Sequence, residues 1–316
     1  MSKVLADRSG RLRLVAATFT AMREDGSVNL DAIEAQAEHL TRGGLDGVFI
    51  CGSTGESASL SSEERAAIAR RWCEVAGPEL LRIVHIGHPS LPEARSLAAK
   101  AQEAGADAIA ALAPFYFRPR DLDQLVAFCA EVAAAAPELP FLYYHIPEMT
   151  NVRVSVPDLM RLARKRIPTF AGVKFTHTDL IEMAASMEEA GDELEIFNGP
   201  DSLLLQSLTV GVRSAVGSTY NFASPSYRTM YESYLAGDMV GALAQQSRIR
   251  RMVAVGGRHG GMPAFKAIAS LAGPELGPCR LPFLRLSAED RAGIKEELAA
   301  EGMLEMVGAG SASVPA

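Results

Sequence analysis

Lys174 lies inside an otherwise apolar stretch, FAGVKF at residues 170–175. Lysine is rarely fully buried unless something in the structure compensates for its charge. Burial lowers the pKa of an amine, and a neutral lysine can attack a carbonyl carbon to form a Schiff base. A lysine that pairs with a buried carboxylate, or whose aliphatic stem reaches the edge of the fold, gives the same pattern. Lys174 is therefore a candidate nucleophile with two structural alternatives.

Two hydroxyl groups follow another apolar stretch, in the sequence CGSTGE at residues 51–56. Ser53 and Thr54 stand between glycines, which allow backbone amides to approach a ligand closely. Hydroxyls and amides together make an uncharged site that suits a carboxylate. The same residues could instead form a glycine turn in which Ser and Thr bond to local backbone groups.

A pair of tyrosines, Tyr143 and Tyr144, lies in the stretch FLYYHIP at residues 141–147. Neighbouring side chains of a strand point to opposite faces, so one phenol should face the interior of a closed sheet and the other its outer layer. A buried phenol needs a hydrogen-bond partner. The inner tyrosine is either a candidate for proton transfer or a packing residue whose hydroxyl is satisfied.

Two further stretches end in polar residues, NGPDS at 198–202 and GSTYN at 217–221. Asp201 and Ser202 could contact a substrate, or they could cap the helix that follows. Barrels often bind phosphate after their last two strands, but neither stretch contains a lysine or an arginine that would require one.

The histidines give no reason to expect a metal site. They are scattered, and the one close pair, His85 and His88, should point to opposite faces of its strand. An enzyme that breaks a carbon–carbon bond beside a ketone needs an electron sink. An iminium on Lys174 is the sink that this sequence offers, with no separate cofactor.

Composition narrows the class of protein. The chain has 316 residues, 48% of them hydrophobic, and a formal net charge of −7. It lacks a basic stretch, which argues against nucleic acid as a partner. Its apolar runs are too short for a membrane helix, and its first residues do not resemble a signal peptide. The four cysteines are scattered, which favours a reducing compartment. We therefore expect a cytoplasmic globular protein with no membrane partner.

Eight short apolar runs alternate with longer amphipathic stretches. The runs are mostly continuous, as in strands buried on both faces of a parallel sheet. They cover residues 14–20, 47–52, 82–87, 108–114, 141–147, 170–175, 194–199 and 214–219. Helices are expected at 29–42, 61–76, 91–104, 122–136, 156–165, 179–190 and 202–210. The pattern predicts an α/β fold, a (β/α)8 TIM barrel. A doubly wound open sheet is the alternative, but GxGxxG is missing after the first run.

The domain boundaries follow from where this alternation starts and stops. We expect residues 1–13 to be an N-terminal segment, 14–236 the barrel, 237–302 a C-terminal helical extension and 303–316 a disordered tail. Catalytic groups of a barrel lie at the carboxyl ends of its strands and in the loops that follow. The candidate residues above stand at such positions.

Four motifs, in this order and spacing, resemble the dihydrodipicolinate synthase / N-acetylneuraminate lyase family of class I aldolases, over about residues 14–300. They are GSTGE at 52–56, YHIP at 144–147, GVK at 172–174 and GSTYN at 217–221. The chain is most similar to the N-acetylneuraminate lyase branch. Dihydrodipicolinate synthases usually carry an arginine two residues after the proline of the tyrosine motif, where this chain has Met149. This difference argues against the lysine-biosynthetic reaction.

The resemblance implies a role for each motif. Lys174 forms the Schiff base with pyruvate or a 2-keto acid, and Tyr144 transfers protons. Ser53 and Thr54 bind the carboxylate. Tyr116 matches a tyrosine that reaches into a neighbouring subunit's site, so a homo-oligomer is expected, a tetramer by resemblance. The positions that touch the sugar chain in sialic acid lyases match Thr176, Gly199, Asp201 and Ser218.

Ser202 departs from the family's pattern, because those lyases typically have a glutamate there that binds substrate hydroxyls. Losing such a partner changes substrate discrimination, so Ser202 is a further substrate-binding candidate. We expect a lyase that cleaves a sugar-like 2-keto acid to pyruvate and an aldehyde, with N-acetylneuraminate as the first substrate to test. The alternatives are a dehydratase or aldolase of another deoxy-keto sugar acid or aromatic 2-keto acid, and a non-catalytic 2-keto acid sensor.

Overall fold

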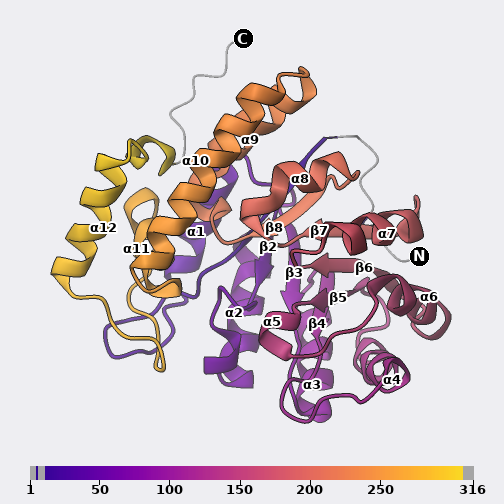
Figure 1. Ribbon diagram of the computed structural model, residues 1–316. Helices are drawn as coiled ribbons and strands as arrows, with labels where there is room; N and C mark the ends of the chain where they lie inside the picture. Colours follow the sequence, from indigo (N-terminus) through magenta and orange to yellow (C-terminus); the bar gives the residue numbers. More distant parts are fainter. Residues whose placement is uncertain (1–4, 6–10, 309–316) are drawn as a thin grey trace.

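Eight parallel strands close into a barrel in chain order (Figure 1). This computed structural model describes Leu5 and residues 11–308. The ring is completed by the parallel pairing of β8 with β1. The strands are β1 (Arg13–Ala17), β2 (Gly47–Ile50), β3 (Leu81–His85), β4 (Ala108–Leu112), β5 (Phe141–His145), β6 (Phe170–Phe175), β7 (Glu195–Asn198) and β8 (Ser214–Gly217). The predicted TIM barrel is confirmed, and the open-sheet alternative is wrong.

Helices connect successive strands and surround the barrel. Local signals set their ends; Ser61 caps α2 and forms a capping box with Glu64, as the serines and acids at this point predict. The helices are α1 (Ala32–Arg42), α2 (Ser62–Val75), α3 (Leu91–Glu103), α4 (Leu122–Ala133), α5 (Pro147–Thr150), α6 (Val156–Arg166), α7 (Leu180–Ala190), α8 (Leu204–Thr209) and α9 (Tyr220–Leu235), with short 3-10 helices η1 (Ser57–Ser59) and η2 (Asp201–Leu203).

Two apolar cores follow from the alternation of side chains along the strands. Phe49, Leu142 and Tyr144 pack inside the barrel, whereas Tyr143 packs in the layer between strands and helices. The predicted division of the two tyrosines is therefore confirmed, with Tyr144 inside. Lys174 is the register partner of Tyr144 on the neighbouring strand, so both side chains face the same side of the sheet.

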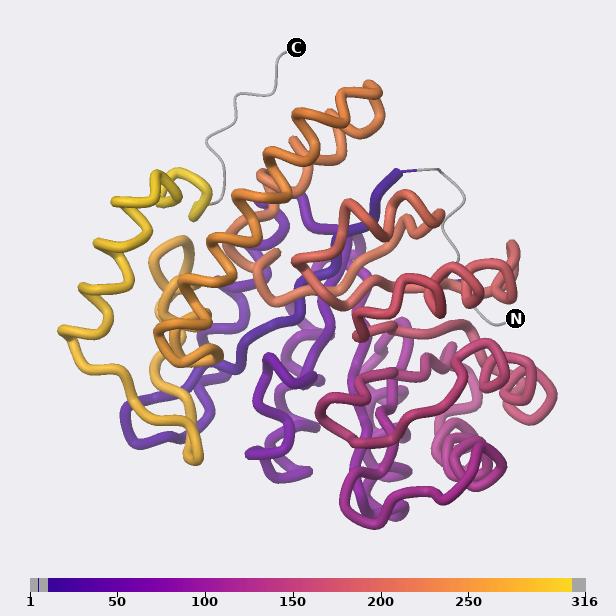
Figure 2. Tube along the Cα trace, in the orientation of Figure 1, coloured from indigo at the N-terminus to yellow at the C-terminus, as the bar shows by residue number. Residues whose placement is uncertain are grey.

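The C-terminal helices pack beside the barrel. They are α10 (Met239–Arg258), α11 (Met262–Ala272) and α12 (Ala288–Ala300), followed by η3 (Leu304–Met306). α10 contacts α9, and α11 and α12 pack on α10. In Figure 2 these orange and yellow segments lie beside the indigo beginning of the chain. Arg280, in the loop between α11 and α12, bonds to Glu64 at the start of α2 and to the carbonyl of Gly26.

Residues 303–308, the beginning of the expected tail, pack against the helical extension in the structure. Met303 and Met306 are buried and η3 contacts α9, because this segment carries apolar side chains that the helical extension can cover. Residues 309–316 of the expected tail, and most of segment 1–13, lie outside the described residues. Among the helices that the structure describes, none is both long and apolar enough to cross a membrane.

Candidate active site

Lys174 lies at the centre of the barrel, on β6, with 4% of its surface exposed. Its Nζ lies 3.9 Å from the centre of the Phe49 ring and 4.1 Å from the centre of the Tyr144 ring. Aromatic faces attract a cation but replace only part of its hydration. Because Lys174 is buried, its amine does not reach the solvent at the edge of the fold. This rules out the alternative in which the aliphatic stem carries the charge to the surface.

Burial lowers the pKa of Lys174 from 10.5 to about 7, and the charge of Asp201 opposes this shift. Loss of hydration disfavours the ammonium form more than the neighbouring carboxylate favours it. Lys174 and Asp201 form no ion pair within 4.0 Å among the described residues. A substantial fraction of the amine is therefore neutral near pH 7 and able to attack a carbonyl carbon.

Tyr144 places its hydroxyl 3.4 Å from the hydroxyl of Ser53 on the loop after β2. Its ring meets the rings of Phe49 and His85 edge-on. Burial raises the pKa of the Tyr144 phenol, and the neighbouring hydroxyls of Ser53 and Thr176 oppose this shift. A phenol held beside the amine of Lys174 and linked to a hydroxyl can pass protons to and from a bound substrate.

Thr54 belongs to the same loop and spans the barrel mouth to the end of β8. Its Oγ1 lies 2.8 Å from Oγ of Ser218. Cys51, at the start of this loop, has a φ of 55°, so the chain turns sharply out of β2. The turn brings Ser53 and Thr54 over the barrel opening rather than continuing outward. These hydroxyls form a polar rim on the side of the site nearest to Tyr144.

Asp201 follows β7, and its side chain is held by Thr219 in the turn between β8 and α9. Its Oδ2 accepts hydrogen bonds from the amide and hydroxyl of Thr219, at 3.0 and 2.7 Å. Its Oδ1 is buried and has no hydrogen-bond partner among the described residues. A Cβ on Gly217 would lie 1.7 Å from Oδ1, so only glycine fits there. Asp201 therefore does not cap its own helix through its side chain.

Thr176 and Gly199 stand together on the ends of β6 and β7. The Thr176 hydroxyl is buried near the Tyr144 phenol and makes no hydrogen bond of good geometry in the described part of the chain. Gly199 donates its amide to the carbonyl of Phe175, and a Cβ on Gly199 would lie 1.9 Å from Oγ1 of Thr176. Ser202 is partly exposed on η2, beside Asp201. All of these predicted positions therefore lie at one end of the barrel.

Tyr116 is the one predicted site residue that this chain does not bring to the lysine. It lies on the loop after β4, 74% exposed, and packs edge-on against the exposed ring of Phe117. Phe115, Tyr116 and Phe117 together form an exposed aromatic loop.

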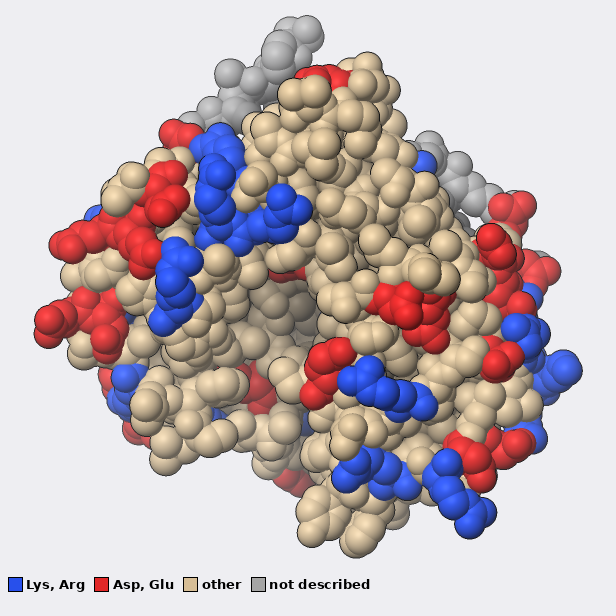
Figure 3. Space-filling view, in the orientation of Figure 1, with Lys and Arg blue, Asp and Glu red and all other residues tan. Residues whose placement is uncertain are grey.

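Met149, which stands where related synthases have an arginine, lines a cavity of about 400 Å³ that Ser53 also lines. Figure 3 shows a hollow in the middle of the face seen in Figure 1. The cation in the cavity wall, Arg65, donates to the carbonyl oxygens of His85 and Gly87. Because position 149 is a methionine, its side chain offers no positive charge that could bind a second carboxylate.

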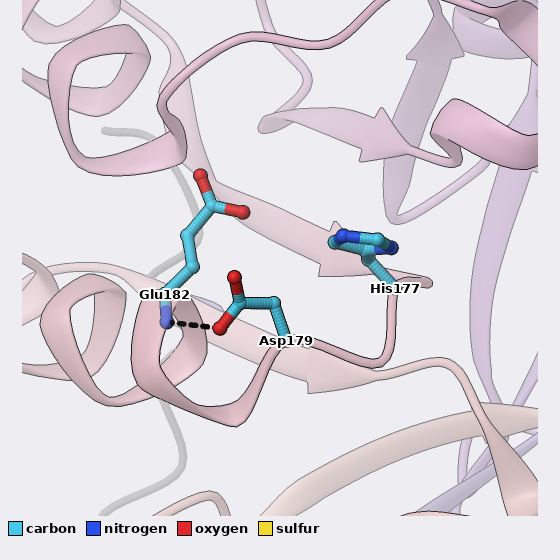
Figure 4. A group of neighbouring side chains, drawn as sticks. All are labelled: His177, Asp179 and Glu182. Atoms are coloured by element: carbon cyan, nitrogen blue, oxygen red, sulfur yellow. Dashed lines mark hydrogen bonds between the residues drawn. The ribbon is translucent and has the colours of Figure 1, made fainter.

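His177, Asp179 and Glu182 form a group whose ligand atoms lie within 4.8 Å of one another (Figure 4). Each is already engaged in the fold. Asp179 caps α7 by accepting from the amides of Ile181 and Glu182, and Glu182 accepts from the amide of Val156. Nδ1 of His177 lies 2.9 Å from the carboxylate of Glu148. Helix capping and hydrogen bonds to neighbouring parts of the fold explain why these three side chains lie together.

Three residues of the site were missed from the sequence. Phe49 forms the floor under Lys174, and His85 packs behind Tyr144. Nδ1 of His85 lies 2.8 Å from the carbonyl oxygen of Cys51. Burial holds the pKa of His85 well below its usual value, so the ring is neutral and Nδ1 donates this bond. Glu56, the last residue of the GSTGE motif, is completely buried against Lys266 of the C-terminal extension.

A partly neutral amine inside a parallel barrel, beside a phenol and several hydroxyls, has the chemistry that Schiff-base formation with a carbonyl substrate requires. The chain belongs to the dihydrodipicolinate synthetase family, whose family model matches residues 11–301. Both statements agree with the resemblance seen in the four sequence motifs.

Similar proteins place the chain within this family. It is 39% identical to the N-acetylneuraminate lyase of Mus musculus over 281 residues, which cover 87% of this chain and 88% of that protein. The solved N-acetylneuraminate lyase of Proteus mirabilis superposes with a TM-score of 0.90 at 33% identity, covering 93% of this chain and 99% of that chain. The solved N-acetylneuraminate lyase of Aliivibrio salmonicida superposes with a TM-score of 0.90 at 34% sequence identity. The match covers 94% of this chain and 98% of that chain.

Proposed function

We propose that this protein is a Schiff-base lyase that cleaves a sugar-like 2-keto acid into pyruvate and an aldehyde. The observation that carries the proposal is the buried Lys174 amine with its pKa near 7. The relatives named N-acetylneuraminate lyase support the same reaction class. N-acetylneuraminate is therefore the first substrate to test.

The proposed chemistry assigns a task to each group. The Lys174 amine adds to the keto carbon of the substrate and water leaves, which gives an iminium. When the carbon–carbon bond breaks, its electron pair moves toward the iminium nitrogen and an enamine forms. Tyr144 takes up the hydroxyl proton of the departing aldehyde and can return a proton to the enamine. Hydrolysis of the iminium then releases pyruvate and restores the amine.

The hydroxyls around the lysine give the substrate its orientation. Ser53 and Thr54, with their backbone amides, would hold the carboxylate without a counter-charge. Burial takes water away from Oδ1 of Asp201 and from the hydroxyl of Thr176, and both would gain a hydrogen bond from a substrate hydroxyl. Ser202 and the Gly199 backbone adjoin them. These groups would recognise the sugar-like half.

We also propose that the active form is a homo-oligomer in the cytoplasm. The exposed loop of Phe115, Tyr116 and Phe117 is the face that would meet a second copy, with a tetramer as the expected assembly. Large exposed aromatic groups mark such interaction sites. All four cysteines are free thiols, which suits a reducing compartment.

The test is to incubate the protein with pyruvate and borohydride and to measure its mass by mass spectrometry. We expect one covalent adduct per chain, located on Lys174 by peptide mapping. Release of pyruvate from N-acetylneuraminate and from other 2-keto sugar acids, measured with lactate dehydrogenase, then defines the substrate. Absence of the Lys174 adduct would rule out the proposed lyase, and an adduct without turnover of any substrate would favour a sensor.

A further inference from the structure

Lys266 is buried more completely than the lysine in the active site. It lies in α11, outside the barrel, and only 1% of its side chain is exposed. A buried ammonium needs an opposite charge and further hydrogen-bond acceptors. Lys266 finds both, because its Nζ donates to Oε1 of Glu56 at 2.9 Å and to the carbonyl oxygen of Pro278 at 2.7 Å. The C-terminal extension thus places a positive charge against the loop after β2.

Both carboxylate oxygens of Glu56 accept hydrogen bonds from the C-terminal extension. Its second oxygen accepts the amide of Arg280 at 2.8 Å, and its side chain is fully buried. Its backbone has a φ of 57°, in the left-handed region that costs energy for any residue except glycine. The ion pair with Lys266 therefore holds Glu56 in a conformation that the local sequence does not favour.

The backbone of Glu56 is directly joined to the carboxylate-binding hydroxyls. Its amide donates to the carbonyl of Ser53 at 3.0 Å, and the amide of Ser57 donates to the carbonyl of Gly52 at 3.3 Å. These bonds close a short loop with Ser53 and Thr54 at its tip. On the other side, Thr20 donates to the carbonyl of Gly55 at 2.7 Å. The loop is thus held between the segment that follows β1 and the extension.

We propose that Lys266 and Glu56 are positioning residues for carboxylate binding, which set the place of Ser53 and Thr54 from outside the barrel. The proposal rests on the proposed function, because it assumes that these two hydroxyls bind a carboxylate. The side chains of Lys266 and Glu56 are buried between the loop and the extension, so they act on a substrate only through the loop. Their contribution is to substrate affinity, since the nucleophile and the phenol lie on β6 and β5.

The test replaces the pair by neutral residues of similar size, in the variant Glu56→Gln/Lys266→Met. A buried ion pair replaced on both sides leaves no isolated charge, so the variant should fold. The matched control is Asp107→Asn/Arg82→Met, which removes a partly buried pair at the amino ends of β3 and β4. Glu56→Asp is the second variant, because it keeps the charge but draws the carboxylate back by one methylene.

Two measurements are made on each variant. The first is the pyruvate concentration that gives half-maximal borohydride trapping, and the second is the hydrogen exchange of the Glu56 and Ser57 amides. We expect both Glu56 variants to raise the half-saturating pyruvate concentration about 10- to 100-fold, with unchanged trapping at saturation and faster exchange. The control should match the unmodified protein in both measurements.

Unchanged half-saturation in a folded Glu56 variant overturns the proposal. So does an equal rise in the control, since the effect then follows from lost stability alone. If the unmodified protein forms no adduct at Lys174, the proposed function fails, and hydrogen exchange decides the positioning role by itself. Faster exchange of the two amides supports it in that case, and unchanged exchange overturns it.

Discussion

Lys174 and Tyr144 are register partners on β6 and β5, and the amine lies 4.1 Å from the centre of the phenol ring. Parallel pairing makes the two side chains point the same way, into the barrel. The arrangement removes water from the amine while keeping a proton-transferring group beside it. The reactivity of the lysine and its burial therefore have one structural cause.

The lowered pKa of Lys174 predicts a specific pH dependence. With a pKa of about 7, half of the amines are neutral at pH 7, compared with about one in 3,000 at the ordinary value of 10.5. The rate of pyruvate trapping at low pyruvate concentration should rise with pH through about 7 and level off above about 8. A rate that still rises tenfold per pH unit at pH 9 would contradict this pKa.

Replacing the buried lysine should make the protein more stable and inactive. Between pH 7 and 10.5 the unfolded chain holds the Lys174 proton and the folded chain does not, so native stability rises with pH across this range. At pH 7 the variant Lys174→Met should gain roughly 1–4 kcal/mol in free energy of unfolding. Urea unfolding should show this gain shrinking toward pH 10.5. Lys295→Met, at an exposed position, is the control and should show no gain.

Removing the Tyr144 hydroxyl should separate bond cleavage from Schiff-base formation. We expect Tyr144→Phe to lower kcat about 10²- to 10⁴-fold, because it deletes a general acid–base group. Pyruvate should still be trapped on Lys174 by borohydride at saturation. Tyr143→Phe is the matched control, because the adjacent phenol packs outside the barrel; equal losses in both variants would argue against proton transfer by Tyr144.

The serine at position 202 should set the preference for the aldehyde half. Ser202→Glu would add a hydrogen-bond acceptor beside Asp201, and we expect it to raise kcat/KM for N-acetylneuraminate about 10-fold. The half-saturating concentration of pyruvate should stay the same, since the carboxylate is bound elsewhere. If instead both values change together, position 202 affects the whole site.

The exposed Tyr116 should act only in a partner's site. Tyr116→Phe and Lys174→Ala should each be less active than the unmodified protein when assayed alone. The activity of the tyrosine variant should fall about 10-fold or more. When the two are refolded together, mixed assemblies contain sites with an intact lysine and a tyrosine from the neighbour. Activity should then exceed the sum of the separate samples. Absence of any gain, with mixing verified by native mass spectrometry, would show that Tyr116 has no such role.

Much of the fold was predictable because its signals are local. Continuous apolar runs predict buried parallel strands, and Ser61 with its acids marks a helix start that the structure confirms. The site at the carboxyl ends follows from the topology alone. The capping alternative for Asp201 could only be decided by the structure, which directs its carboxylate to Thr219 at the start of α9.

The pairing of Glu56 with Lys266 was out of reach of local patterns, because 210 residues separate them. A signal was nevertheless present. Lys266 stands in an apolar helical stretch, MPAFKAIASLA, much as Lys174 stands in an apolar strand. By the same reasoning, the two apolar stretches indicate two buried lysines. What sequence could not supply is the partner that each one meets.

The connection between Glu56 and Lys266 also sets an order of events during synthesis. At about 5–20 residues per second, the ribosome adds Lys266 roughly 10–40 s after Glu56. Until then the nascent chain carries a carboxylate that has no partner to be buried with. The loop of Ser53 and Thr54 therefore reaches its final form only after α11 has been made, and a chain truncated before α11 would carry the lysine nucleophile without a finished binding loop.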